Sequence, residues 1–338
     1  MKQVWISRAG SPEVLEVREA KDPEAGKGEL RIRVKAAGIN FADLMARVGL
    51  YPDAPPIPCV VGYEVAGVVD QVGPGVEGFA VGDRVFGMPR FGGYTDTLAI
   101  SAEQVFHMPE KMSFEEGAAL PVVYLTAYTM MMFTGNLRRG SSVLIHSAAG
   151  GVGIAAIQLA RTRDCVIFGR ASKGKHEYLR SIGVQHCIDN DEDYVAACRR
   201  VVGDKGIDLV LDPVGGKSWR EGYDLLGPCG RLVGFGLSSA ASGKTRNLFH
   251  ALGQVIRIPK YSVRTLMDDN KTVTGVNMGH LFGRLDLLRP QFEDLLAMYE
   301  RAEIAPKVDK SFPFSQAAAA HHFIHDRKAI GKVVLIPD

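Results

Sequence analysis

Short apolar stretches alternate with turn residues over the first third of the chain, a pattern typical of β structure. Leu30–Val34 alternates apolar and polar residues with a period of two, as expected for a half-buried strand. Val65–Val72 and Asp83–Phe86 are two further predicted strands. Clusters of Gly and Pro separate these runs, as in Tyr51–Pro58. Residues 1–122 are therefore predicted to form a small, barrel-like β domain.

From residue 123 the pattern changes to strands that alternate with helices. This spacing predicts parallel strands joined by crossover helices, the arrangement of a doubly wound α/β domain, here over residues 123–280. The predicted strands are Ser142–His146, Cys165–Phe168, His186–Ile188, Asp208–Leu211 and Arg231–Phe235. The predicted helices are Ile154–Arg163, Lys173–Ile182, Asp193–Val202 and Lys217–Leu226.

The remaining residues, 281–338, are predicted to pack back on the first domain and to complete it. They contain two amphipathic helices, Phe292–Arg301 and Ser315–Arg327, and a strand, Lys332–Ile336. An earlier apolar run, Gly117–Phe133, is interrupted by Pro121 and is too short for a bilayer crossing. We expect a buried helix after Pro121 and no integral membrane segment.

Composition and charge exclude several classes of protein. The 338 residues contain 40 Lys and Arg against 38 Asp and Glu, so no excess charge indicates a nucleic-acid partner. The five cysteines are scattered and form no CxxC pair, which argues against a disulfide framework and a structural zinc. The N-terminal residues lack the apolar core of a signal peptide. We therefore expect a cytoplasmic protein.

A glycine-rich turn follows the first strand of the α/β domain and opens its first helix. A dinucleotide pyrophosphate needs close approach of the backbone and free N–H groups at a helix N-terminus. Ala148 stands where the first glycine of the G-x-G-x-x-G pattern is expected, so the motif is partial and a glycine turn of another kind stays open. The predicted contacts to the cofactor are Ala149, Gly150, Gly151, Val152 and Gly153.

The end of the next strand indicates NADPH rather than NADH. An NAD enzyme has Asp or Glu at this place to bind the ribose 2′-hydroxyl. This chain instead offers Arg170, Ser172 and Lys175, which suit a 2′-phosphate. The alternative is that some of these cations are ordinary solvated surface residues.

Several short motifs spread along the chain point to one known family. They are Ala37–Asp43, Gly62–Val69, Val81–Val85, Ala148–Gly153, Asp212–Gly216 and Gly331–Leu335. With these motifs the chain resembles the zinc-less quinone oxidoreductase branch of the medium-chain dehydrogenase/reductases, over essentially its whole length. The resemblance implies a GroES-like β domain beside a Rossmann domain, with the active cleft between them. Within that branch, Lys244–Asn247 and His325–Lys328 are similar to homologues of the vesicle amine transport protein.

The chain differs from zinc alcohol dehydrogenases at the positions where those enzymes bind zinc, and this difference limits the possible substrates. Where those enzymes place Cys, His and Cys, this chain has Asn40, Tyr63 and Val123. An amide, a phenol and an apolar side chain are poor zinc ligands, so no metal site is predicted. Without a Lewis acid, the substrates that remain are already electrophilic, namely quinones and α,β-unsaturated carbonyls.

The resemblance also implies a set of site residues. NADPH is expected to lie across the carboxyl ends of the Rossmann strands, with its nicotinamide near Asn40. Asn40, Tyr51 and Tyr63 are the polar candidates for catalysis, with solvent as a competing proton source. The further residues expected at the cofactor are Thr126, Tyr194, Val214, Phe235, Gly236, Leu237, Gly331 and Lys332.

Several of these residues have simpler interpretations. Asn40 could be a loop residue that bonds its own backbone, and Tyr63 could be an apolar wall of the cleft. Tyr194 could pack as an ordinary helix residue. Glu64 and Asp43 resemble family positions that are mostly structural.

A pair of histidines near the C-terminus invites a metal interpretation. His321 and His325 are four residues apart, so they share one face of the predicted helix. No third ligand is evident, and the neighbouring residues are alanines. We therefore expect a helix surface at this place and no metal site.

Two functional hypotheses follow from the sequence. The first is an NADPH-dependent oxidoreductase of quinones or enones. The second is an NADPH-binding, dehydrogenase-like protein with a regulatory or membrane-associated role and little turnover. Val273–Met278 is predicted as a strand at the edge of the Rossmann sheet. Because related reductases pair this strand across a two-fold axis, we also expect a homodimer.

Overall fold

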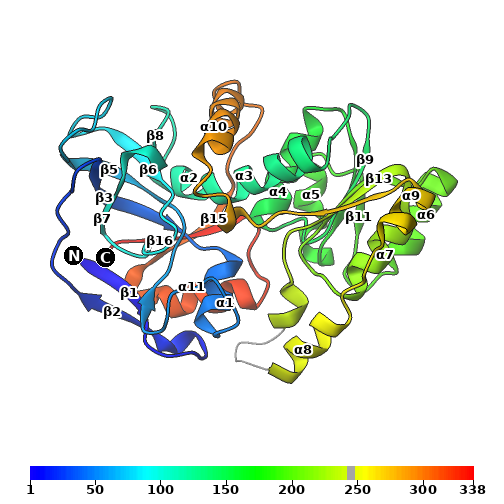
Figure 1. The fold of residues 1–338 in the computed structure, drawn as a ribbon, viewed down its shortest axis with the longest axis horizontal. Helices are drawn as coiled ribbons and strands as arrows, with labels where there is room; N and C mark the ends of the chain where they lie inside the picture. Colours follow the sequence, from blue (N-terminus) through cyan, green and yellow to red (C-terminus); the bar gives the residue numbers. More distant parts are fainter. Residues whose placement is uncertain (242–247) are drawn as a thin grey trace.

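The strands of the chain form two separate groups of sheets, shown in a computed structural model that describes residues 1–241 and 248–338 (Figure 1). The motif Lys244–Asn247 lies outside the described residues. In Figure 1 the N-terminal β structure occupies the left side of the molecule and the parallel sheet occupies the right. The predicted combination of a β-rich domain with a doubly wound α/β domain is confirmed.

The N-terminal β structure contains one large sheet and one small sheet. The large sheet has the order β15-β16-β3-β5-β6-β8, and β7 also pairs with β3. Its strands are β3 (Glu29–Gly38), β5 (Val65–Val72), β6 (Arg84–Gly87), β7 (Thr97–Ser101), β8 (Val105–His107), β15 (Val308–Pro313) and β16 (Lys332–Ile336). The small sheet has the order β2-β1-β4, formed by β1 (Lys2–Ile6), β2 (Leu15–Glu19) and β4 (Cys59–Val60).

The second group is one sheet of parallel strands in the order β11-β10-β9-β12-β13-β14. The winding reverses at β9, which lies between β10 and β12, and such a switch point opens a crevice at the carboxyl ends of the strands. The strands are β9 (Ser142–Ile145), β10 (Val166–Arg170), β11 (His186–Ile188), β12 (Ile207–Asp212), β13 (Leu226–Gly234) and β14 (Thr272–Gly275). The predicted edge strand therefore exists as β14.

Helices connect these parallel strands, as the sequence pattern predicts. The connecting helices are α4 (Gly151–Arg161), α5 (His176–Ser181), α6 (Tyr194–Val202) and α7 (Lys217–Leu225). Two more, α8 (Leu248–Ile256) and α9 (Val263–Asp269), lie between β13 and β14, where the sequence pattern predicts no helix. Short 3₁₀ helices occur at Pro12–Val14, Ala102–Gln104, Lys173–Lys175, Gly203–Lys205, Ser238–Ala241, Met278–His280 and Phe314–Gln316.

The central helices between the two sheet groups are buried. After α1 (Phe41–Arg47) and α2 (Phe114–Ala119), the predicted buried helix begins at Pro121 as α3 (Pro121–Tyr128) and continues as a π-helix over Thr129–Thr134. Val123, Tyr124 and Leu125 of α3 are buried, which confirms the prediction. Helix α3 packs against α4 and so joins the two parts of the molecule.

The C-terminal segment returns to the first domain, as predicted. Strand β16 runs antiparallel to β3, with Val334 opposite Gly38. Helix α10 (Leu285–Glu300) buries Phe292 against Phe86 and Phe106, with ring centroids 5.5 and 4.4 Å apart. In Figure 1 the red β16 lies beside the blue β3, and the orange α10 lies at the top of the molecule. The exact domain limits at 122 and 280 stay predictions.

The predicted surface position of His321 is wrong. This histidine lies in α11 (Ala317–His325) and is fully buried. Its Nε2 atom is 3.4 Å from the Tyr94 hydroxyl, and burial holds its pKa well below the usual range. The small alanine side chains around it allow α11 to pack closely on the sheet, so the alanines that suggest a surface instead favour burial.

Candidate active site

The glycine turn sits at the N-terminus of α4, where the partial motif places it. Gly150 is the N-cap residue, and the N–H groups of the first helical turn have no partners within the helix. A Cβ on Gly153 would lie 2.5 Å from the Ala148 carbonyl oxygen, so only glycine fits there. The turn therefore has the exposed donors and the close packing that a pyrophosphate site requires.

The loop before β16 is attached to this glycine turn. The Gly331 N–H donates to the Ala149 carbonyl at 2.9 Å, and Gly331 and Gly150 form an isolated parallel bridge. Gly331 has a φ of 99°, and a Cβ there would lie 2.4 Å from the Lys307 carbonyl oxygen. The structure thus brings Gly331 and Lys332 to the predicted cofactor turn from the far end of the chain.

Asn40 lies in a buried network with Lys332 and Glu64. The Lys332 ammonium donates to Asn40 Oδ1 at 2.5 Å and lies 2.6 Å from a Glu64 carboxylate oxygen. Asn40 Nδ2 donates to the same carboxylate at 2.8 Å. Since the ammonium only donates and the carboxylate only accepts, the orientation of the Asn40 amide is fixed.

Glu64 also reaches the helices between the two sheet groups. Its second oxygen accepts from the Val122 N–H at 2.8 Å, in the first turn of α3. The family resemblance assigns Glu64 a mostly structural role and does not reveal its pairing with Lys332. A signal is present in the sequence, because Glu64 is a carboxylate in the otherwise apolar and fully buried stretch before β5.

Asp43 forms hydrogen bonds to the backbone of the loop that carries Asn40. Its carboxylate accepts from the backbone N–H groups of Asn40, at 2.7 Å, and Gly62, at 3.0 Å. Burial raises the pKa of Asp43 to about 7, while these donors and Lys332 act in the opposite direction. Asp43 holds the loop that carries Asn40 and is itself buried away from solvent.

Tyr51 and Tyr63 lie together in an aromatic cluster. The ring of Tyr63 is 6.4 Å from Tyr51, 5.1 Å from Phe91 and 6.0 Å from Phe282. The Tyr63 hydroxyl is buried and has no hydrogen-bond partner among the described residues. Burial raises the pKa of both phenols, so each is a protonated donor at neutral pH.

Arg170 and Tyr194 form one unit at the carboxyl end of β10. The Arg170 guanidinium lies 4.6 Å from the centre of the Tyr194 ring and donates to the Asn190 carbonyl at 2.8 Å. The Tyr194 hydroxyl donates to Glu221 at 3.1 Å. The structure therefore brings together a cation and an aromatic ring that the sequence predicts at the 2′-phosphate.

Ser172 and Lys175 follow on the same loop but differ in their surroundings. Ser172 is exposed. The Lys175 amine donates to the Ala329 carbonyl at 2.5 Å, and partial burial lowers its pKa. Lys175 is thus held against the segment that leads to Gly331, whereas the sequence predicts its amine at the 2′-phosphate.

The remaining predicted cofactor residues fall into two places. Val214 and Phe235–Leu237 follow β12 and β13, where the Val214 and Phe235 N–H groups donate to Asp212 at 2.6 and 3.1 Å. Thr126 is buried in α3, and its hydroxyl donates to the Val122 carbonyl at 2.6 Å. The hydroxyl of Thr126 is therefore engaged within its own helix.

A buried polar cluster that the sequence does not predict lies at the carboxyl ends of β9 and β12. His146 follows β9, and its Nε2 atom is 3.9 Å from Asp212. Neither ring nitrogen has a hydrogen-bond partner among the described residues, and burial lowers the pKa of His146. Asp212 instead accepts from Ser218 Oγ. The apolar strand pattern before His146 carries no sign that its side chain is buried beside a carboxylate.

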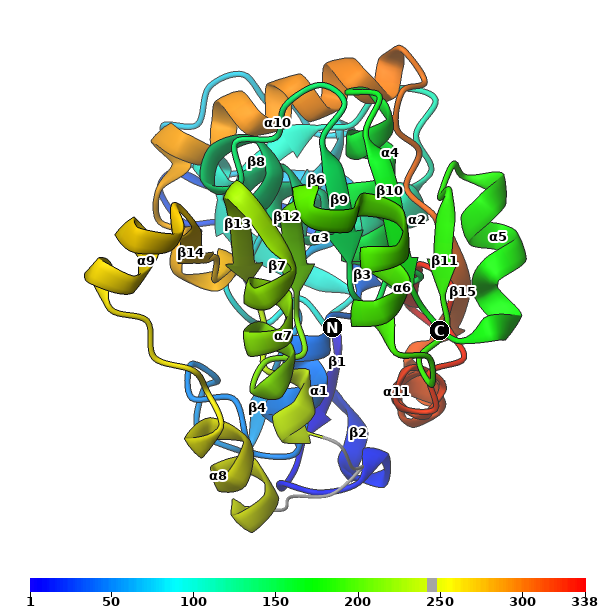
Figure 2. The ribbon, with the colours of Figure 1, turned by 90° about the vertical axis from the view of Figure 1, so that its right-hand side faces the viewer.

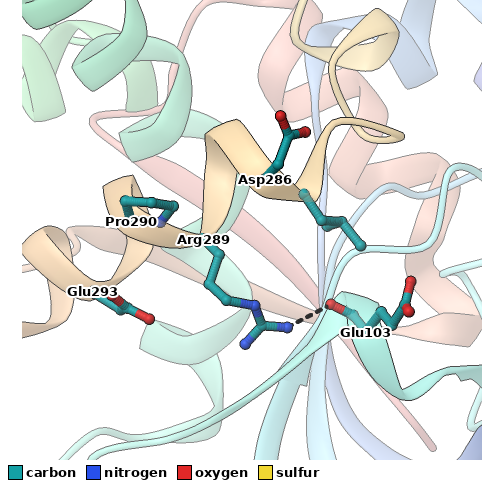
Figure 3. Close-up of a pocket in the computed structure, with 6 residues that line it drawn as sticks. Glu103, Asp286, Arg289, Pro290 and Glu293 are labelled. Carbon is teal, nitrogen blue, oxygen red and sulfur yellow. Dashed lines mark hydrogen bonds between the residues drawn. The ribbon is translucent and has the colours of Figure 1, made fainter.

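The hollow drawn in Figure 3 lies apart from the candidate active site. It lies between α10 and the turn at Glu103, and the Arg289 guanidinium donates to the Glu103 carbonyl at 3.0 Å. None of the predicted site residues lines it. Its lining residues are Glu103, Leu285, Asp286, Arg289, Pro290 and Glu293.

Comparisons with known proteins agree with this fold. Residues 26–110 match the family model of the alcohol dehydrogenase GroES-like domain, and residues 182–335 match that of the zinc-binding dehydrogenases. A synaptic vesicle membrane protein VAT-1 homolog from Rattus norvegicus is 43% identical over 325 residues, which are 96% of this chain and 80% of that protein. A quinone oxidoreductase from Pseudomonas aeruginosa is 33% identical over 99% of both chains.

A solved structure shows the same fold. The quinone oxidoreductase of Escherichia coli, in complex with NADPH, has a TM-score of 0.88 with this chain. The two are 28% identical, and the match covers all of both chains. In the part of the chain that the structure describes, every helix falls short of the length and apolar character needed to span a bilayer.

The Lys332–Glu64 pair leads to the first testable prediction. Lys332→Met leaves the Glu64 carboxylate buried without its counter-charge, so we expect a loss of about 3–5 kcal/mol in the free energy of unfolding. The double variant Lys332→Met/Glu64→Gln removes both charges and is expected to lose clearly less than the sum of the two single changes. Urea denaturation of the parent, both single variants and the double variant measures this coupling. Purely additive losses would show that the two side chains do not interact.

Proposed function

The chain belongs to the medium-chain dehydrogenase/reductase family, in the quinone oxidoreductase branch, and on this premise we propose that it is an NADPH-dependent, zinc-independent oxidoreductase. It transfers hydride to quinones or α,β-unsaturated carbonyls. The similarity to quinone oxidoreductases, one of them solved with NADPH, supports an oxidoreductase of this kind.

One observation carries the proposal. The glycine turn and Asn40 belong to different domains, yet residues 331 and 332 bond to both. Gly331 donates to Ala149 at the turn, and Lys332 donates to Asn40. A dinucleotide is an extended ligand that must contact a pyrophosphate site and a reaction site at once. Because Gly331 and Lys332 are adjacent in the chain, their two contacts hold the pyrophosphate site and the reaction site at a fixed separation.

The donor set supports zinc independence. Asn40 offers an amide that is already bonded to a carboxylate and to an ammonium. The buried Lys332 cation beside it would repel a second cation. Tyr63 contributes a phenol whose pKa is raised by burial and which therefore resists the deprotonation that metal binding favours.

The residues of the chain then have separable tasks in the reaction. When bound, NADPH supplies the hydride. The glycine turn binds the pyrophosphate through its backbone N–H groups, and Lys332 with Glu64 holds the Asn40 amide in one orientation. The substrate oxygen that gains charge needs a hydrogen-bond donor. Tyr63 is assigned this role because its hydroxyl is buried and has no partner among the described residues, with Tyr51 beside it.

The surroundings of Tyr63 favour a flat, apolar substrate. Phe91 and Phe282 pack on Tyr63 from different parts of the chain, and Tyr51 meets its ring edge-on. Aromatic faces exclude water and stack on conjugated ring systems. A quinone or an aryl enone matches such a wall better than a charged metabolite does.

Turnover is the test of this function. Purified protein should oxidise NADPH with saturable rates in a panel of quinones and enals, and the rates should be unchanged by a zinc chelator because no metal takes part. Ordinary alcohols should not be oxidised. Oxidation of primary alcohols that the chelator abolishes would contradict the proposal. Binding of NADPH without turnover would favour the alternative of a regulatory, dehydrogenase-like protein.

The choice of cofactor can be tested at Arg170. Arg170→Glu places a carboxylate where the 2′-phosphate is expected, so the KM for NADPH should rise by about tenfold or more while that for NADH changes little. Steady-state kinetics with both cofactors measure this selectivity. Arg139→Gln, an exposed position before β9, is the matched control. An equal effect on both cofactors would remove Arg170 from the 2′-phosphate site.

The alternative function has its own support. The VAT-1 homologs are named as synaptic vesicle membrane proteins, although no described helix of this chain spans a bilayer. A membrane role would therefore require contact through the protein surface. For the enzyme itself we propose a cytoplasmic location, which the scattered free cysteines support.

We also propose that the protein is a homodimer formed through β14. This strand is the last of the parallel sheet and is only partly covered. Exposed edges invite pairing with a second chain, and pairing through the same edge on both copies closes a two-fold dimer. Sedimentation velocity at micromolar concentration is expected to show the mass of two chains. A monomer alone would contradict this proposal.

A further inference from the structure

The histidine that follows β9 has no task in the reaction described above. His146 is 1% exposed, and neither of its ring nitrogens has a hydrogen-bond partner among the described residues. Burial lowers its pKa, so the imidazole is uncharged at neutral pH. Without hydrogen bonds and without a charge, this side chain acts on its neighbours chiefly through the contacts of its ring.

The ring of His146 contacts the ring of Tyr194, the first residue of α6. The two ring centroids are 4.9 Å apart, and the ring planes meet at 86°. This edge-to-face arrangement is one that aromatic rings prefer. Among the described aromatic side chains, His146 is the ring partner of Tyr194, so it supports the Tyr194 ring in its observed orientation.

Tyr194 in turn supports the side chain of Arg170. The guanidinium lies over the Tyr194 ring, 4.6 Å from its centre, and one of its nitrogens donates to the Asn190 carbonyl at 2.8 Å. The Nε atom of Arg170 is buried and has no partner in the part of the chain that the structure describes. A positive charge and a donor are thus left for an anion from outside the chain, which fits the 2′-phosphate of NADPH.

The carboxylate beside Tyr194 is engaged by other groups. Glu221 lies on α7, which packs beside α6 on the side of the parallel sheet that faces the viewer in Figure 2. One oxygen of Glu221 accepts from the Tyr194 hydroxyl at 3.1 Å, and the other lies 2.7 Å from the Lys217 ammonium. Because both oxygens have partners, Glu221 competes weakly for the Arg170 guanidinium.

The second carboxylate near His146 is used in a similar way. Asp212 lies 3.9 Å from Nε2 of His146, which is too long for a hydrogen bond. One oxygen of Asp212 accepts from the Ser218 hydroxyl, and the other accepts from the Val214 N–H at 2.6 Å. Asp212 thus holds the start of the loop after β12, and the contact of His146 with Tyr194 is the one that leads toward the cofactor.

We propose that His146 is a positioning residue for the 2′-phosphate of NADPH. Its ring holds Tyr194, and Tyr194 holds the Arg170 guanidinium ready for the phosphate. A donor that is held in place before binding loses less freedom when the ligand arrives, so it binds more tightly. The selectivity for NADPH over NADH then depends on a buried side chain behind the binding surface. The inference rests on the proposed function, since it requires a cofactor with a 2′-phosphate.

The binding of nucleotides without a nicotinamide tests this inference. Adenosine 2′,5′-bisphosphate carries the 2′-phosphate and adenosine 5′-monophosphate lacks it, so the ratio of their dissociation constants in calorimetry isolates that group. His146→Leu removes the ring that supports Tyr194. It should weaken binding of the bisphosphate by about fivefold or more and leave binding of the monophosphate nearly unchanged. His146→Phe restores a ring and should bind both nucleotides as the parent protein does.

A second variant tests whether His146 acts through Tyr194. Tyr194→Leu should show the same selective loss, and His146→Leu/Tyr194→Leu should lose no more than Tyr194→Leu alone. Tyr194→Leu also carries the test if His146→Leu does not fold. The matched control is His186→Leu, because the His186 ring stacks on Phe168, 4.6 Å away in the same sheet. This control should leave the ratio unchanged, and melting temperatures show which variants are folded.

The possible failures can be told apart. A folded His146→Leu variant that weakens both nucleotides equally has lost only a structural contact, and this result would overturn the inference. An unchanged ratio in Tyr194→Leu would overturn it as well. In both cases the parent protein still prefers the bisphosphate. A parent protein that binds the two nucleotides equally would overturn the proposed choice of NADPH together with the inference.

Discussion

A buried ion pair at the junction of the two domains organises the rest of the site. Lys332 and Glu64 are almost completely removed from water, and neither charge is tolerable there without the other. Their pairing leaves one donor for Asn40 Oδ1 and one acceptor for Asn40 Nδ2, so the amide is held by two charged groups. Glu64 uses its second oxygen to hold the start of α3. The Lys332–Glu64 ion pair therefore fixes the positions of Asn40, helix α3 and strand β16 relative to one another.

This arrangement explains why Asn40 and the two tyrosines of the site have different chemical roles. Asn40 has little freedom to act as a general acid, since an amide carries no ionisable proton and its partners fix it. The phenols behave differently, because burial among Phe91 and Phe282 keeps them protonated and leaves the Tyr63 hydroxyl without a partner among the described residues. The division of labour between a fixed amide and an available phenol follows from their surroundings, not from their position in the sequence.

Local sequence patterns predict much of the fold, but they do not predict contacts between residues that are far apart in the sequence. Val65–Val72 and Lys332–Ile336 match the observed strands because alternation and apolar runs report burial directly. The glycine turn also lies within one strand–turn–helix unit. Asn40 and Lys332, by contrast, are 292 residues apart, so no local pattern reports their contact. Phe249, Leu252, Val255 and Ile256 recur at helical spacing, so the sequence pattern is compatible with helix α8, but it does not indicate which side of the helix contacts the protein. The burial of His321 is not predicted because its alanine neighbours suggest a surface.

The return of β16 to the first domain has a consequence for biosynthesis. Residues 142–275 hold the strands of the parallel sheet, which can associate as soon as they have emerged from the ribosome. The first domain lacks β15 and β16 until much later, and its Glu64 carboxylate must wait for a counter-ion that is translated after the whole parallel sheet. The N-terminal domain is thus expected to complete its folding last although it is synthesised first. The parallel sheet is already available by then, so the N-terminal domain can pack against it.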